Sequence, residues 1–134
     1  MEAFRSGQYL TFRVARQEFA IEAGAVRAVL PAHDMDPADR PVPEWLAGEA
    51  WLRGVAFPVL DLRLKLNLRH GISGRNPSIV VVDTGSLVGF LADTVSEIIH
   101  ARAHDFRNGK LRIGRPRTVV HLSELSVAEP APTL

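Results

Sequence analysis

The sequence predicts an all-β domain of many short strands, folded as a barrel or sandwich with room for two small barrels. Short segments alternate apolar and polar residues, and 10 glycines and 9 prolines among 134 residues punctuate them. Short strands joined by tight turns are typical of such folds. We expect one domain over residues 1–134, with sub-barrels at roughly 8–68 and 78–125 and a disordered tail at 126–134.

The N-terminal segment predicts a hairpin followed by a helical turn. Residues 8–15 alternate, with Leu10, Phe12 and Val14 on one face, which indicates a half-buried strand. Residues 18–22 alternate again after a tight connection at Arg16 and Gln17. Residues 23–30 change period, and the apolar residues there are spaced for one face of about two helical turns. These are Ala25, Val26, Val29 and Leu30. Residues 31–43, with four prolines and three aspartates, predict a loop.

The densest apolar stretch, residues 43–68, holds both tryptophans and predicts two buried strands. Gly54 lies where these strands meet and indicates a bulge or sharp bend. Pro58 indicates a sheet edge or irregularity. Asp61 resembles the N-cap of a short helical turn. Arg53, a charge beside a glycine bend, is either an edge cation with a buried stem or a contact group for a partner.

The second half of the chain predicts further strands after a loop at 69–77. Residues 78–83 and 87–92 form strands around a turn at 84–86, and residues 94–101 form an extended segment. Asn108 and Gly109 predict a hairpin turn. The last strand is expected at residues 118–121.

The residue types exclude most chemistry. The formal net charge is +1. Cysteine is absent, so we expect no disulfide and no thiolate zinc site. His33, Asp34 and Asp36 suggest a metal loop, but the glycine and glutamate of a calcium loop are missing. No pattern supplies a nucleophile, a base and an oxyanion site together. We expect no enzyme, no cofactor and no metal. Without a signal peptide or membrane-length apolar run, the expected location is cytoplasmic.

A basic segment at residues 102–117 allows two interpretations. It holds six cations, Arg102, Arg107, Lys110, Arg112, Arg115 and Arg117, against the single acid Asp105. It is an electrostatic footprint for RNA, DNA or an acidic protein surface, or it is the exposed face of a hairpin. Nucleic-acid binding by a small barrel through this segment is our alternative function. Only Phe106 there could stack on a base, which argues against single-strand recognition.

Motifs spread over residues 8–100 together resemble the CheW-like domain, the family of the chemotaxis coupling protein. The matching segments are YLTFRVARQEFAIEAGAVRAVLP, VPEWLAGEAWLRGVAFPVLDLRLKL and SIVVVDTGSLVGFLADTVSEII. The resemblance implies two intertwined SH3-like β-barrels and a non-catalytic role. It implies an adaptor between the cytoplasmic tip of methyl-accepting chemoreceptors and the regulatory domain of a CheA-type histidine kinase, in swimming chemotaxis or a related motility array.

The resemblance also implies site residues. Arg53 and Gly54 fall at the family's receptor- or kinase-contact position. Val26 and Val29 either line the groove between the barrels, where a receptor helix would bind, or pack in the core.

For three glycines, Gly48, Gly54 and Gly89, backbone geometry is favoured over contact.

Three departures from the family pattern bear on the second barrel. Ala28 replaces an acidic residue, and His121 and Leu122 stand where a leucine–aspartate pair is expected. The segment between residues 99 and 119 is short and lacks the usual extra strand. We therefore expect a trimmed or open second barrel, whose strand edges could pair with a partner or in a homodimer.

Overall fold

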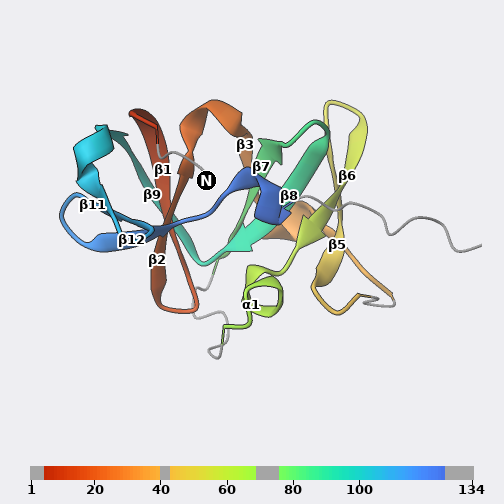
Figure 1. The fold of residues 1–134 in the computed structure, drawn as a ribbon. Helices are drawn as coiled ribbons and strands as arrows, with labels where there is room; N and C mark the ends of the chain where they lie inside the picture. The colour runs from red at the N-terminus through yellow and green to blue at the C-terminus, as the bar shows by residue number, and fades with distance from the viewer. Residues whose placement is uncertain (1–4, 40–42, 69–75, 126–134) are drawn as a thin grey trace, which may run out of the picture.

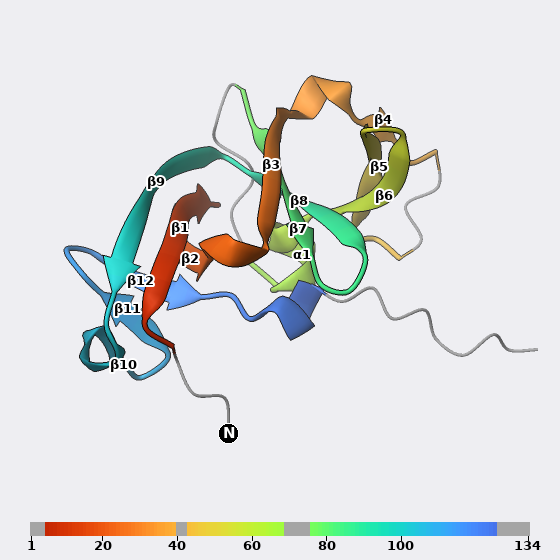
Figure 2. The same cartoon turned by 90° about the horizontal axis from the view of Figure 1, so that it is seen from above.

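The computed structural model describes residues 5–39, 43–68 and 76–125. Within these residues the strands form two six-stranded sheets, and each sheet curls toward a barrel (Figures 1 and 2). The predicted all-β class with two small barrels is confirmed. The predicted tail and most of the predicted loop at 69–77 lie outside the described residues.

The first sheet contains both the beginning and the end of the described chain. Its strand order is β10-β11-β12-β2-β1-β9. The strands are β1 (Gly7–Val14), β2 (Gln17–Glu22), β9 (Thr94–Ala101), β10 (Phe106–Arg107), β11 (Lys110–Arg112) and β12 (Pro116–Val119). Strand β12 runs parallel to β2, while β1 runs antiparallel to β2 and β9.

The second sheet is made by the middle of the chain, in the order β3-β7-β8-β6-β5-β4. The strands are β3 (Val26–Pro31), β4 (Asp36–Pro37), β5 (Leu46–Leu52), β6 (Val55–Leu60), β7 (Ser78–Asp83) and β8 (Leu87–Ala92). The short helices are η1 (Ala23–Ala25), η2 (Ala32–Asp34), α1 (Leu62–Lys65), η3 (Ala103–Asp105) and η4 (Leu122–Leu125).

The division between the sheets differs from the predicted sub-barrels at 8–68 and 78–125. Strands β1 and β2 pair with the C-terminal strands, and the chain crosses back to them at Asp93, between β8 and β9. Pairings distant in sequence decide this arrangement, and local patterns carry no information about them.

Three hydrophobic clusters explain which strands are buried on both faces. Two of these clusters lie inside the barrels, one in each, and the third lies between the barrels. In β1, Tyr9 packs inside the first barrel while Leu10 packs between the barrels. In β7, Ile79 faces the second barrel's interior and Val80 faces the junction. The prediction that residues 8–15 form a half-buried strand was therefore wrong, because Tyr9 and Thr11 are buried too.

One further prediction is corrected. Residues 23–30 form one turn, η1, and then strand β3, because Val26–Pro31 pairs with β7. The segment between residues 99 and 119 contains β10, β11 and most of β12, and among the described residues each sheet has six strands. That this segment is short relative to the family pattern stays a prediction.

Three hairpins turn on two-residue connections with positive φ at both positions. They are Ala15–Arg16 (50° and 69°), Arg53–Gly54 (50° and 80°) and Asn108–Gly109 (52° and 75°). This backbone matches the right-handed twist of paired strands. The predicted hairpins at residues 8–22 and at Asn108–Gly109 are confirmed.

Candidate functional site

The β5–β6 hairpin presents a basic tip. Arg53 and Gly54 form its turn, so the predicted sharp bend at Gly54 is confirmed. Both residues are exposed, and Arg53 makes no ion pair within the part of the chain that the structure describes. Because its φ of 50° lies in the left-handed region, arginine is held there at a conformational cost.

Apolar side chains flank this tip on the outside of the barrel. Trp51 is 47% exposed and pairs across the strands with Ala56, which is also exposed. Val55, directly after the turn, is 53% exposed. The opposite face of the hairpin is buried through Ala50 and Phe57. We call Trp51, Arg53, Val55 and Ala56 the hairpin surface.

The exposure of Trp51 contradicts the expectation that the strands around it are buried. The other tryptophan, Trp45, packs against the core, with the Lys65 ammonium 4.1 Å from its ring centroid. The sequence did carry a signal for Trp51. Along a strand, alternate residues share a face, so Trp51 lies on the side of the charged Glu49, while the small Gly48 and Ala50 point inward.

Val26 and Val29 lie on one face of strand β3, although the expected helix is absent. Val26 pairs with Val82 and Val29 pairs with Val80, and a register shift between Val26 and Ala28 accounts for their three-residue spacing. Val80 and Val82 both belong to the cluster between the barrels. Paired residues share a face, so both β3 valines are directed toward the junction. Val26 packs against that cluster, whereas Val29 is 45% exposed.

Strand β9 supplies a matching residue that the sequence analysis missed. Ile98 is 58% exposed and pairs with Leu10, another member of the cluster between the barrels. Strand β3 is an edge strand of the second sheet and β9 an edge strand of the first, and both border the junction (Figure 2). We call Val26, Val29 and Ile98 the junction surface. The alternation in β9 is weak, so its sequence gave little indication of this face.

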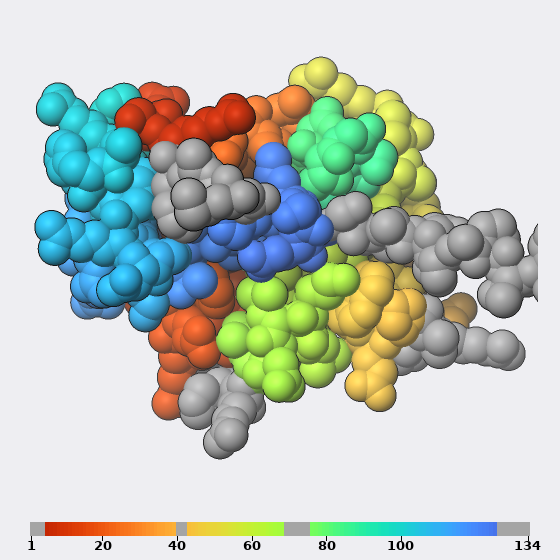
Figure 3. Space-filling view, in the orientation of Figure 1, coloured from red at the N-terminus to blue at the C-terminus, as the bar shows by residue number. Residues whose placement is uncertain are grey.

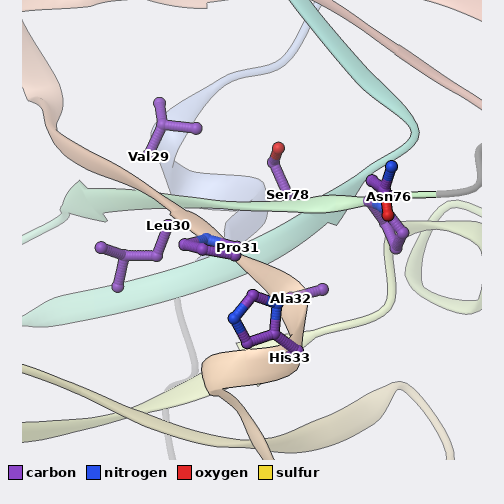
Figure 4. A pocket seen from close by; sticks show the side chains of 8 residues that line it. Val29, Leu30, Pro31, Ala32, His33, Asn76 and Ser78 are labelled. Carbon is purple, nitrogen blue, oxygen red and sulfur yellow. The ribbon is translucent and has the colours of Figure 1, made fainter.

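An open groove of about 590 Å³ adjoins Val29 on β3. Its lining residues are Val29, Leu30, Pro31, Ala32, His33, Asn76, Pro77 and Ser78. Figure 4 shows Val29 and Leu30 projecting from opposite sides of the strand, with Ser78 on the neighbouring β7. The backbone N–H of Ala32 donates to the carbonyl of Pro77 at 3.1 Å, which fixes the two sides of the groove relative to each other.

The predicted structural residues occupy tight positions. A Cβ on Gly89 would lie 2.7 Å from Ile79 Cγ2 and 2.9 Å from Phe57 Cε2. A Cβ on Gly48 would collide with the carbonyl oxygen of Asp36, so this glycine allows β4 to approach β5.

Asp61 is the N-cap of α1 and accepts from the Arg63 backbone N–H at 3.0 Å. Its carboxylate also binds the Arg63 guanidinium through two hydrogen bonds of 3.0 and 2.6 Å.

The described residues hold no group of three or more side chains suited to a metal ion, and His33 pairs only with the neighbouring Asp34, at 3.3 Å. The pKa of the Arg63 guanidinium is raised, mainly by its hydrogen bonds to Asp61. No helix among the described residues is long and apolar enough to cross a bilayer.

Comparison with known proteins agrees with a β-barrel module of this kind. The family model for the CheW-like domain matches residues 8–124. The chain belongs to the CheW-like domain family.

Curated relatives are chemotaxis proteins. The chain is 28% identical over 102 residues to the chemotaxis protein CheW of Klebsiella aerogenes, covering 75% of this chain and 60% of that protein. It is 31% identical over 104 residues to the CheW of Rhizobium meliloti, covering 75% and 64%. The chain thus spans somewhat under two thirds of the length of these relatives.

A solved structure shares the fold. The scaffolding protein TtCheW of Thermoanaerobacter tengcongensis matches with a TM-score of 0.67 at 21% identity, over 76% of this chain and 66% of that one. At this identity the likeness shows a shared fold.

Proposed function

We propose that this protein is a non-catalytic adaptor that couples the cytoplasmic tip of a chemoreceptor to the regulatory domain of a CheA-type histidine kinase. Family membership supports the kind of role. The observation that carries the proposal is the presence of two separate exposed apolar surfaces, because a bridging protein needs one for each partner. A cytoplasmic location is part of the proposal.

The hairpin surface is the proposed kinase contact. Exposed Trp51 beside Arg53 combines two residue types that dominate binding energy at protein interfaces. The turn backbone is fixed by paired strands on both sides, so the surface is preorganised and loses little conformational entropy on binding.

The junction surface is the proposed contact for a receptor helix. Val29 and Ile98 extend the core between the barrels to the exterior, from the edge strands of two different sheets. A helix presents apolar side chains at three- and four-residue spacing, and such a ridge suits an apolar strip between two barrels.

The kinase contact is tested by titrating the kinase regulatory domain with wild-type protein and with Arg53→Glu. Arg16→Glu is the matched control, because Arg16 is an exposed arginine in the equivalent turn of the β1–β2 hairpin. We expect Arg53→Glu to weaken binding about tenfold or more and Arg16→Glu to leave it unchanged. Equal affinity for all three proteins would move the kinase contact away from the hairpin surface.

We further propose that the free edge of β3 or β9 allows the chain to form a homodimer. Each of these strands has a hydrogen-bonded neighbour on only one side among the described residues. Unpaired strand edges are sites of pairing between chains. Sedimentation equilibrium over a range of concentrations tests this, and a monomer at the highest concentration would exclude the dimer.

A further inference from the structure

The outer face of the β10–β12 strands carries three cations. Arg107 pairs with Lys110, and Arg112 pairs with Pro116. In β11, Leu111 lies between Lys110 and Arg112 and is fully buried, so these two cations project to the opposite, outer side. All three cations are exposed. In Figure 3 this segment, coloured cyan to blue, protrudes at the left of the molecule, away from the β5–β6 hairpin.

The acids near this face are engaged elsewhere. Glu18 forms ion pairs with Arg13 at 3.3 Å, Arg115 at 3.6 Å and Arg117 at 3.9 Å. Within the described ranges, no ion pair neutralises Arg107, Lys110 or Arg112. Like charges opposite each other on paired strands are destabilising. The Arg107–Lys110 pair therefore contributes nothing favourable to the fold by itself.

Two of these arginines share one groove. Arg107 and Arg112 line an open groove of about 290 Å³ together with His104 and Asp105. The Asp105 carboxylate accepts from the Arg102 backbone N–H at 2.7 Å and lies 3.4 Å from His104 Nε2. Among the described residues Asp105 forms no ion pair with either guanidinium group, so the groove carries two arginine charges against one carboxylate. Guanidinium groups bind carboxylates in a bidentate geometry.

We propose that Arg107, Lys110 and Arg112 form a docking surface for a carboxylate-rich segment of a protein partner. A protein partner is favoured over nucleic acid for two reasons. Phe106, the aromatic ring of this segment, packs against Tyr9 with centroids 5.3 Å apart and offers no stacking platform. Three cations on a chain of net charge +1 are also too few for strong phosphate-driven binding. The surface lies on a different sheet from the hairpin surface, so its test is independent of the kinase contact.

The experiment titrates a short polyglutamate peptide into the full chain at low salt, using wild type, Arg107→Glu, Arg112→Glu and the control Arg16→Glu. We expect each groove substitution to weaken binding about fivefold, because it replaces an attraction by a repulsion of similar size. The Arg16→Glu control should bind like wild type.

Three results would overturn the proposal: no peptide binding at low salt, equal weakening by Arg16→Glu, or tighter binding of a competing anion. The competing anions are a short DNA duplex and vesicles of phosphatidylserine and phosphatidylcholine. Circular dichroism and thermal melting of every variant establish that it is folded.

Discussion

The carboxylate of Asp93 accepts a hydrogen bond from the backbone N–H of Ala15 at 2.9 Å. Asp93 lies at the crossover between the sheets, and Ala15 lies in the β1–β2 turn, 78 residues away. The backbone N–H of Asp93 donates in turn to the carbonyl of Arg13 at 2.8 Å. Both Asp93 and Ala15 are buried, so this side chain ties the crossover to the hairpin without help from solvent.

Replacing Asp93 by alanine should lower the free energy of unfolding by about 1–3 kcal/mol, because the buried Ala15 N–H loses its acceptor. Asp93→Asn keeps an oxygen acceptor at the same place and should cost less. Urea unfolding of the three proteins measures this. Equal losses in both variants would mean that the carboxylate charge, rather than this hydrogen bond, is what stabilises the crossover.

Gly89→Ala should destabilise the protein by about 1–3 kcal/mol, the usual cost of overpacking a core. The new methyl group would meet Ile79 and Phe57 at less than contact distance. Gly24→Ala is the control, because nothing lies within 4 Å of the added Cβ. Thermal unfolding compares the two variants with wild type, and an unchanged melting temperature for Gly89→Ala would show that the interior of the second barrel can relax around an extra methyl group.

Arg63→Ala should destabilise the protein by about 1–2 kcal/mol, since it leaves the Asp61 carboxylate, 7% exposed, without its guanidinium partner. In the Arg63→Ala background, Asp61→Asn should recover part of this loss, because asparagine is also a good N-cap and carries no charge. Chemical unfolding of the single and double variants checks the coupling. Additive losses would show that the ion pair contributes no stability of its own.

Trp51→Ala should weaken kinase binding about tenfold or more while changing stability little, because the side chain is about half exposed. Trp45→Ala is the contrasting variant, since Trp45 packs against the core and should mainly lower stability. Binding titration and unfolding on the same samples separate the two effects. A large stability loss in Trp51→Ala with unchanged kinase affinity would remove Trp51 from the proposed contact.

Local patterns in the sequence predicted most strands, but the partners of those strands could not be read from it. The turn at Asn108–Gly109 and the N-cap at Asp61 depend on neighbouring residues, and both are found as expected. The pairing of β1 with β9 joins segments from opposite ends of the domain, and nothing in either segment specifies the other. The same limit applies to the Asp93–Ala15 hydrogen bond.

The apolar residues of 23–30 show how two structures can share one pattern. Val26 and Val29 are three residues apart, which fits one face of a helix. In the structure the register shift in β3 inserts an extra residue between them and places both on one face of a strand. The two valines therefore share a face for a reason other than the predicted helix, whereas Leu30, predicted on the same face, packs on the opposite side of the strand. Pairing with the buried strand β7 decides the backbone conformation.

The site was only partly accessible from sequence. Arg53 was singled out as a candidate because a charge beside a glycine bend is unusual in an apolar stretch. Trp51 was missed, because an aromatic residue in a predicted strand is ordinarily buried. Ile98 was missed because its exposed position beside the junction depends on the pairing of β9 with β1, which is a property of the whole fold.

The most direct test of the account asks whether the chain joins two partners at once. The full chain, the kinase regulatory domain and a receptor cytoplasmic fragment are mixed and analysed by size-exclusion chromatography with light scattering. The account predicts one complex containing all three, from which Arg53→Glu releases the kinase domain and Val29→Asp releases the receptor fragment. Competition between the two partners for the wild-type chain, or loss of both partners in either variant, would contradict the claim of two separate coupling surfaces.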